Sequence, residues 1–299
     1  MSIKDSVLAF IIVLVWGVNF VVIAYGLYGM PPFLLGGVRF LLVFAIGCWF
    51  VKRPNIPFKW LLGYALAISF AQFGFLFLAM SLGMPAGLAS LILQSQALFT
   101  LIFAYLLLKE QIKISQILTI LVAGIGLALI GVSSGDSKMS LIGFVLTILA
   151  ASSWALGNLV TRAISQQGYK VDSGLVVWAA LISSGPFFVV SLFVDGWDVI
   201  VDSLININTA SVLSLLYLAL VATIIGYSLW SYLLAKYPAG VVAPLTLGVP
   251  IIGLLSASII LNEDLNAQQW LGAVIVMFGL MINMRLDKQV MKSLRRMFN

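Results

Sequence analysis

The polar side chains that could bind a ligand lie inside long apolar stretches of this sequence. Trp16 and Asn19 are three residues apart, and Trp154 and Asn158 are four apart. Residues at these spacings share one face of a helix, so each pair offers an aromatic ring beside an amide, a combination suited to a small zwitterion. The alternative is that the amides bridge neighbouring helices, as they do in membranes.

Arg39 lies well inside another apolar stretch. It is about six residues in, and therefore roughly 9 Å deep at about 1.5 Å per residue. A buried guanidinium could hold the carboxylate of a substrate. Two structural alternatives stay open: the guanidinium could bond the carbonyls of a helix end, or the side chain could snorkel to the outer headgroups.

A second polar group comprises Gln72, Gln94 and Gln96. Two residues apart on a helix point about 200° from each other. We therefore expect one of Gln94 and Gln96 to line a cavity and the other to bond a neighbouring helix, and we assign Gln72 and Gln94 to the cavity. Together with Tyr227 and Trp230, which share a face, the candidate substrate-binding residues are Trp16, Asn19, Arg39, Gln72, Gln94, Trp154, Asn158, Tyr227 and Trp230.

The sequence lacks the side chains of the common catalytic and metal sites. It has no His, and its single Cys48 lies in an apolar stretch, so His-based triads and the usual zinc sites are excluded. No phosphate-binding Gly-rich loop is present. We expect Glu110 and Glu263, both at helix ends, to cap the following helix or to anchor a repeat. We therefore predict no catalytic residue, cofactor or metal.

The elements that position these residues must be membrane-spanning helices. The chain is 62% hydrophobic and 9% charged, with a mean hydropathy of +1.15, whereas soluble domains carry about 25% charged residues. About 20 apolar residues cross the hydrocarbon core of a bilayer. Ten stretches qualify, at 7–28, 33–51, 60–81, 86–108, 115–132, 141–163, 174–194, 210–235, 240–261 and 267–284.

The distribution of basic residues predicts the orientation. With the N-terminus inside, 14 Lys and Arg residues fall on inner segments, Lys138 alone falls outside, and Arg39 remains within a span. The positive-inside rule then places both termini in the cytoplasm. We interpret the basic tail as an anchor beside anionic lipid and predict no contact with nucleic acid. The pattern leaves the oligomeric state open.

One pattern occurs twice in the sequence. Pro85-Ala86-Gly87 opens an apolar run that ends at Glu110, and Pro238-Ala239-Gly240 opens another, 153 residues later, that ends at Glu263. A Gln and a Gly follow each Glu at the same spacings. Five helices per unit would give the two copies opposite topology. We predict an all-α membrane protein with a 5+5 inverted repeat, in units 1–135 and 136–286 with a tail at 287–299.

The duplicated pattern, together with Trp16-Gly17-Val18-Asn19, resembles the EamA family of the drug/metabolite transporter (DMT) superfamily. The resemblance covers both repeats, and it extends to the stretches at 15–23, 68–73, 83–90 and 221–224. It implies a ten-helix efflux carrier of the bacterial inner membrane with a central cavity. These stretches are most similar to family members that export O-acetylserine and cysteine. Where the family commonly has a Pro in the fourth helix, this chain has Ala97, while Pro250 occupies the matched position, so a kink at this level should be one-sided.

Two other functions stay open at this stage. The aromatic content of 12% would suit a broad exporter of aromatic compounds or drugs. A membrane-embedded enzyme acting on lipids would need ionisable groups at an interface, which Glu110, Glu263 and the loop aspartates could supply. An inverted repeat favours a transporter. No acidic residue lies in the middle of a predicted span, so the common carboxylate proton relay has no candidate.

Overall fold

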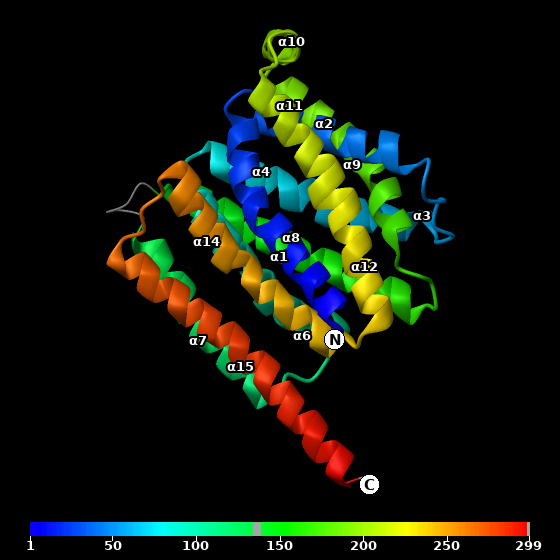
Figure 1. Ribbon diagram of the computed structural model, residues 1–299, viewed down its shortest axis with the longest axis vertical. Coiled ribbons are helices and arrows are strands. Elements are labelled where there is room, and N and C mark those ends of the chain that lie inside the picture. Colours follow the sequence, from blue (N-terminus) through cyan, green and yellow to red (C-terminus); the bar gives the residue numbers. More distant parts are fainter. Residues whose placement is uncertain (134–138, 298–299) are drawn as a thin grey trace.

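The structure is a computed structural model that describes residues 1–133 and 139–297 (Figure 1). The described residues form helices and connecting loops, without a strand. The first half of the chain comprises α1 (Ile3–Leu27), α2 (Pro32–Gly47), α3 (Phe58–Tyr64), the π-helical η1 (Ala65–Gln72), α4 (Phe73–Ser81), α5 (Ala86–Ile92), the 3-10 segment η2 (Leu93–Ser95), α6 (Gln96–Leu108) and α7 (Ile114–Val132).

The second half has the same kinds of element in nearly the same order. It comprises α8 (Leu141–Gln166), α9 (Ser173–Val194), α10 (Trp197–Ile205), α11 (Thr209–Leu216), the π-helical η4 (Tyr217–Ile225), α12 (Gly226–Lys236), α13 (Ala239–Val242), the 3-10 segment η5 (Ala243–Leu247), α14 (Gly248–Leu261) and α15 (Ala267–Met297).

All ten predicted stretches coincide with helices. Among the described residues, eight helices are long and apolar enough to cross a membrane, and two apolar helices, Pro32–Gly47 and Ala267–Ile282, are shorter. The second helix ends at Gly47 rather than at residue 51. The last helix continues through the basic tail to Met297. Helix α10 was not predicted, and in Figure 1 it projects from one end of the bundle.

Departures from α-helical geometry recur at matched sequence positions. The π segments η1 and η4 lie 153 residues apart to within one residue, and the 3-10 segments η2 and η5 overlap at the same offset. A 3-10 segment therefore ends shortly before Ala97 in the first half and shortly before Pro250 in the second. Proline removes a backbone donor, but the first half forms the same irregularity without one. The one-sided kink stays a prediction.

The two loops that carry the repeated glutamates have the same backbone geometry. Lys109 and Asn262 both adopt left-handed conformations, with φ of 55° and 53°. The following helices are capped by glutamines: Gln116 accepts from the backbone N–H of Lys113 at 2.9 Å, and Gln269 accepts from that of Asn266 at 3.0 Å. Of the two alternatives for Glu110 and Glu263, a cap on the following helix is therefore wrong, because the glutamines occupy that position. The other alternative, an anchor of the repeat, is confirmed for Glu263, which accepts from the backbone N–H groups of Ala86 and Gly87.

Glycines allow α7 and α15 to pack closely along one edge of the bundle (Figure 1). A methyl group added to Gly126 would lie 2.7 Å from the carbonyl oxygen of Gly272, and one added to Gly279 would lie 2.8 Å from the backbone nitrogen of Ala123. Gly126, Gly272 and Gly279 therefore lie in close helix contacts. A methyl group added to Gly124, in contrast, would meet nothing within 4 Å.

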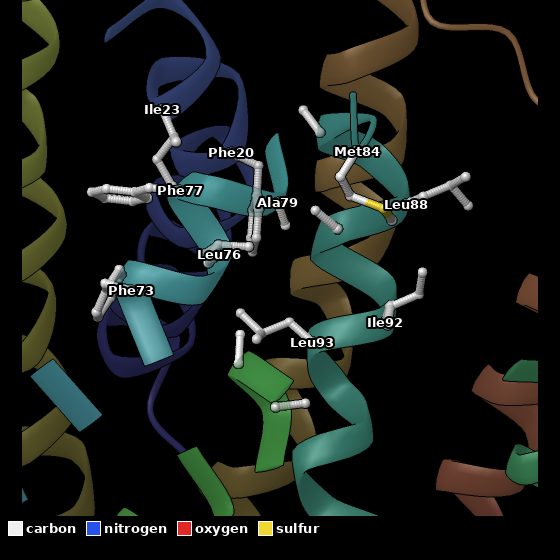
Figure 2. Close-up of a cluster of buried hydrophobic side chains, with 14 of the residues drawn as sticks. Phe20, Ile23, Phe73, Leu76, Phe77, Ala79, Met84, Leu88, Ile92 and Leu93 are labelled. Atoms are coloured by element: carbon white, nitrogen blue, oxygen red, sulfur yellow. The ribbon is translucent and has the colours of Figure 1, made fainter. Parts of the chain in front are cut away.

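The main core extends through the bundle and includes buried residues of α7 and α15. Phe77, Leu88, Ile92 and Phe187 are fully buried in it, and Figure 2 shows the side chains of α1, α4 and α5 that gather there. We refer below to two ends of the bundle. The amino-terminal end is where α1 begins and α6 and α12 end, and the opposite end is where α5 begins and α14 ends.

Candidate functional site

The aromatic residues predicted in separate parts of the chain form one cluster. The ring of Trp16 in α1 packs against Tyr227 at 5.4 Å and against Trp230 at 5.5 Å, both from α12. Its indole N–H donates to the backbone carbonyl of Ala222 at 3.0 Å. The rings of these three candidates thus lie together, and the polar atom of Trp16 is bonded to the backbone.

The carbonyl that receives Trp16 belongs to the π segment η4. A π turn closes its hydrogen bonds over five residues rather than four, and such segments are frequent at functional sites. The hydroxyl of Thr223 follows the same spacing, because it donates to the carbonyl of Leu218, five residues earlier, at 2.7 Å. Ala222 and Thr223 therefore direct polar atoms toward α1 and α2.

Arg39 is buried beside this segment. It is 2% exposed, and its Nη2 donates to the hydroxyl of Thr223 at 3.1 Å. Its guanidinium carbon lies 4.1 Å from the centre of the Phe73 ring, a cation–π contact. Both structural alternatives are therefore wrong: the side chain does not reach the headgroups, and its partner is a hydroxyl rather than a helix-end carbonyl.

The Arg39 guanidinium retains unused donors. Within the described part of the chain, its Nε and Nη1 have no hydrogen-bond partner, and no carboxylate forms an ion pair with it. A buried charge without a partner is costly in a medium of low dielectric constant. Asn19, 8% exposed, likewise has a buried carbonyl oxygen without a partner among the described residues. Among the described residues the hydroxyls of Ser95 and Ser211 are also buried without a partner.

The second predicted pair behaves differently. The Asn158 amide in α8 donates to Gln96 Oε1 at 2.7 Å and to the hydroxyl of Thr100 at 3.1 Å, both in α6. Gln96 is therefore the glutamine that bonds a neighbouring helix, as the opposite directions of Gln94 and Gln96 predicted. Asn158 itself bridges helices, which is the alternative that the sequence left open for these amides.

Three candidates are not joined to either group. Gln72 and Gln94 are buried, at 4% and 7% exposure; Gln72 is the last residue of η1 and Gln94 the middle residue of η2. For neither of them, nor for the partly buried Trp154, does the described part of the chain provide a hydrogen-bond partner. Their assignment to a cavity stays a prediction.

A buried carboxylate at the amino-terminal end was not predicted as a functional group. Asp5 is fully buried and accepts from Lys236 at 2.9 Å and from the hydroxyls of Tyr237 and Ser2, both at 2.6 Å. This network ties the start of α1 to the end of α12. The available signal was the Asp at the margin of an apolar stretch, where a charge usually faces the lipid headgroups.

Comparison with known proteins decides the family. The family model described as "EamA-like transporter family" matches residues 4–132 and again 141–285. The chain belongs to the EamA-like transporter family. It is therefore a multi-pass membrane transporter of the efflux type and not the lipid-modifying enzyme that its sequence left open.

Two relatives of this EamA-like chain are similar over nearly their whole length. The "Probable amino-acid metabolite efflux pump" of Escherichia coli (strain K12) is 49% identical over 290 residues, and that of Salmonella typhimurium is 50% identical, each over 95% of both chains. A solved crystal structure covering 97% of this chain and 99% of its own has a TM-score of 0.64 at 16% identity. That likeness shows the fold alone.

Proposed function

We propose that this EamA-like transporter exports small amino-acid metabolites, of the class of cysteine and O-acetylserine, across the bacterial inner membrane. The names of the two similar relatives support the amino-acid class. The narrower choice of cysteine-pathway substrates follows the resemblance of the sequence stretches around Trp16, Gln72 and Pro85 to exporters of these compounds.

The observation that carries this proposal is the unpaired guanidinium of Arg39. The group is 2% exposed and keeps free donors at Nε and Nη1 within the described chain. A substrate carboxylate would supply both the missing charge and two acceptor oxygens in the fork geometry that arginine prefers. The neighbouring rings of Trp16, Tyr227 and Trp230 would receive an aliphatic or thiol side chain, and the Asn19 carbonyl would accept from the substrate ammonium.

Transport would proceed by alternating access of two inverted five-helix repeats, with units at 1–135 and 136–286 and with both termini in the cytoplasm. Three observations support this arrangement. The π and 3-10 segments recur at matched positions, the loops at Lys109 and Asn262 have the same backbone geometry, and the family model matches each half separately.

Transport into proteoliposomes tests the substrate class. Radiolabelled cysteine and O-acetylserine would be supplied, with cysteamine, which is cysteine without its carboxylate, as a competing ligand. We expect Arg39→Met to lower the kcat/KM for cysteine by at least about 100-fold, because it removes two charge-assisted hydrogen bonds of about 1.5–3 kcal/mol each. Inhibition by cysteamine should change little, because it has no carboxylate to lose.

The control variant is Gly124→Ala, since a methyl group added at Gly124 would meet nothing within 4 Å, and it should transport like the parent. An equal loss of cysteine transport and cysteamine inhibition in Arg39→Met would mean that Arg39 is structural. If folded parent protein carried neither amino acid but carried planar aromatic compounds, the function would be that of a broad aromatic exporter.

A further inference from the structure

The two repeated glutamates have different partners at the two ends of the bundle. At the opposite end, both oxygens of the Glu263 carboxylate accept backbone N–H bonds, from Ala86 at 2.7 Å and from Gly87 at 2.9 Å. An ionised carboxylate that accepts two N–H groups at the start of a helix forms strong, charge-assisted bonds. Glu263 thus fastens the second half of the chain to the first.

Helices α5 and α14, which follow and precede this contact in the chain, pack directly against each other. α5 packs along α14, and a methyl group added to Gly87 would lie 3.2 Å from both Leu254 and Ala257. The hydroxyl of Ser90 faces Gly253 at a separation that leaves no room for a side chain. At the opposite end α5 and α14 are therefore in direct contact, and the Glu263 carboxylate lies beside a small cavity that Gly87 and Leu254 also line.

The parts of a second such contact are present at the amino-terminal end. Glu110 is the sequence counterpart of Glu263, and the backbone N–H of each donates to a carbonyl six residues earlier, in Ala104 and Ala257, at 3.3 Å. The counterparts of Ala86 and Gly87 are Ala239 and Gly240, which begin α13 after Pro238.

The Glu110 carboxylate binds an arginine side chain of another helix. Glu110 forms a bidentate pair with Arg162 of α8, at 2.6 and 2.9 Å, and both side chains are partly exposed, at 36% and 48%. On this side α6 packs against α8, whereas α13 and η5 pack against α12 and α1. An exposed ion pair contributes little to stability, so Glu110 can leave Arg162 at small cost.

We propose that Glu110 and Glu263 are alternating gate ligands. As the amino-terminal end closes, Glu110 leaves Arg162 and accepts the backbone N–H groups of Ala239 and Gly240. As the opposite end opens, Glu263 releases those of Ala86 and Gly87. The inference rests on the alternating-access mechanism proposed above, and it adds the groups that hold each closed state together.

Distances between spin labels test this exchange without any substrate. In a Cys48→Ser background, one labelled pair at Leu82 and Ile260 reports on the opposite end, and another at Leu107 and Val241 reports on the amino-terminal end; all four side chains are exposed. We expect Glu263→Gln to raise the population with a long Leu82–Ile260 distance about tenfold and to shorten the Leu107–Val241 distance. The matched control Asp264→Asn removes the same charge one residue away and should leave both distributions unchanged.

The variants at the amino-terminal end give the sharper outcome. Arg162→Gln frees Glu110 and should shorten the Leu107–Val241 distance, whereas Glu110→Gln removes the gate ligand and should hold that distance long. If Glu110 served only to pair with Arg162, the two variants would shift the distances in the same direction, and the proposal would be wrong. Should Glu263→Gln fail to fold, this pair of variants decides alone. Because no substrate is used, failure of the assigned substrate class leaves the test valid.

Discussion

Helices α1 and α8 each carry a tryptophan and an asparagine about one turn apart, and they use them in opposite ways. In α1 the indole of Trp16 is bonded to Ala222, while the carbonyl of Asn19 is buried without a partner among the described residues. In α8 the amide of Asn158 is bonded twice, while the Trp154 indole has no bonded partner in the described chain.

The neighbouring helix accounts for this difference. α1 lies against η4, whose π geometry presents a carbonyl to an indole N–H. α8 lies against α6, where Gln96 and Thr100 present acceptors to an amide. The groups that face each helix therefore decide which of the two side chains is bonded within the protein and which is left without a partner. If this interpretation is right, the binding groups are Asn19 in one helix and Trp154 in the other.

The two asparagines give the largest contrast. Asn158→Ala should lower the free energy of unfolding by about 1–2 kcal/mol, because it removes two interhelical hydrogen bonds. Asn19→Ala should leave stability within about 0.5 kcal/mol of the parent and should raise the KM for cysteine. Thermal unfolding in detergent and proteoliposome transport measure the two effects. Equal losses of stability would remove the distinction between the helices.

For the two tryptophans the loss of stability should be smaller, and it should occur in α1 rather than in α8. Trp16→Phe keeps a ring against Tyr227 and Trp230 but removes the N–H bond to Ala222, at a cost of about 1 kcal/mol. Trp154→Phe removes no such bond and should leave the melting temperature unchanged. A lower melting temperature for Trp154→Phe than for Trp16→Phe would show that the Trp154 indole is the structural one.

Substitution of Gln94 or Gln96 should change stability the least. Gln96→Ala leaves Asn158 one partner, Thr100, so the loss of stability should be about 0.6 kcal/mol, a typical interhelical hydrogen bond in a membrane. Gln94→Ala should have no effect on stability but should weaken substrate affinity. If the affinity changed only in Gln96→Ala, the assignment of Gln94 to the cavity would be wrong.

The positions of the long helices could be predicted because lipid imposes a simple rule on the sequence. A spanning segment needs an uninterrupted apolar run, and every run found between 7 and 284 became helical. Helix α10 was missed because it is short and its apolar residues alternate with Asp198 and Asp202. Helix α10 lies at the end of the bundle (Figure 1), where a helix does not need to be apolar along its whole length.

The site was predicted as a set of residues but not as a set of contacts. The grouping of Trp16 with Tyr227 and Trp230 needs the tertiary packing of α1 on α12, which no local spacing encodes. Thr223 was visible only as part of a short stretch, because a threonine in an apolar helix usually bonds its own backbone. In this protein the Thr223 hydroxyl donates to the backbone carbonyl of Leu218 and also accepts a hydrogen bond from Arg39.

The π segments η1 and η4 also set the angular phase of the helices that contain them. Each π turn takes in one residue more than an α turn, so the side chains beyond it are rotated by about 100° relative to an unbroken helix. A helical wheel drawn through 58–81 or 209–236 would therefore assign the later residues to the wrong face. Deleting one residue within Ala65–Gln72 would restore an ordinary α-helix and swing the phenylalanines of α4, including the Phe73 that covers Arg39, away from their present neighbours.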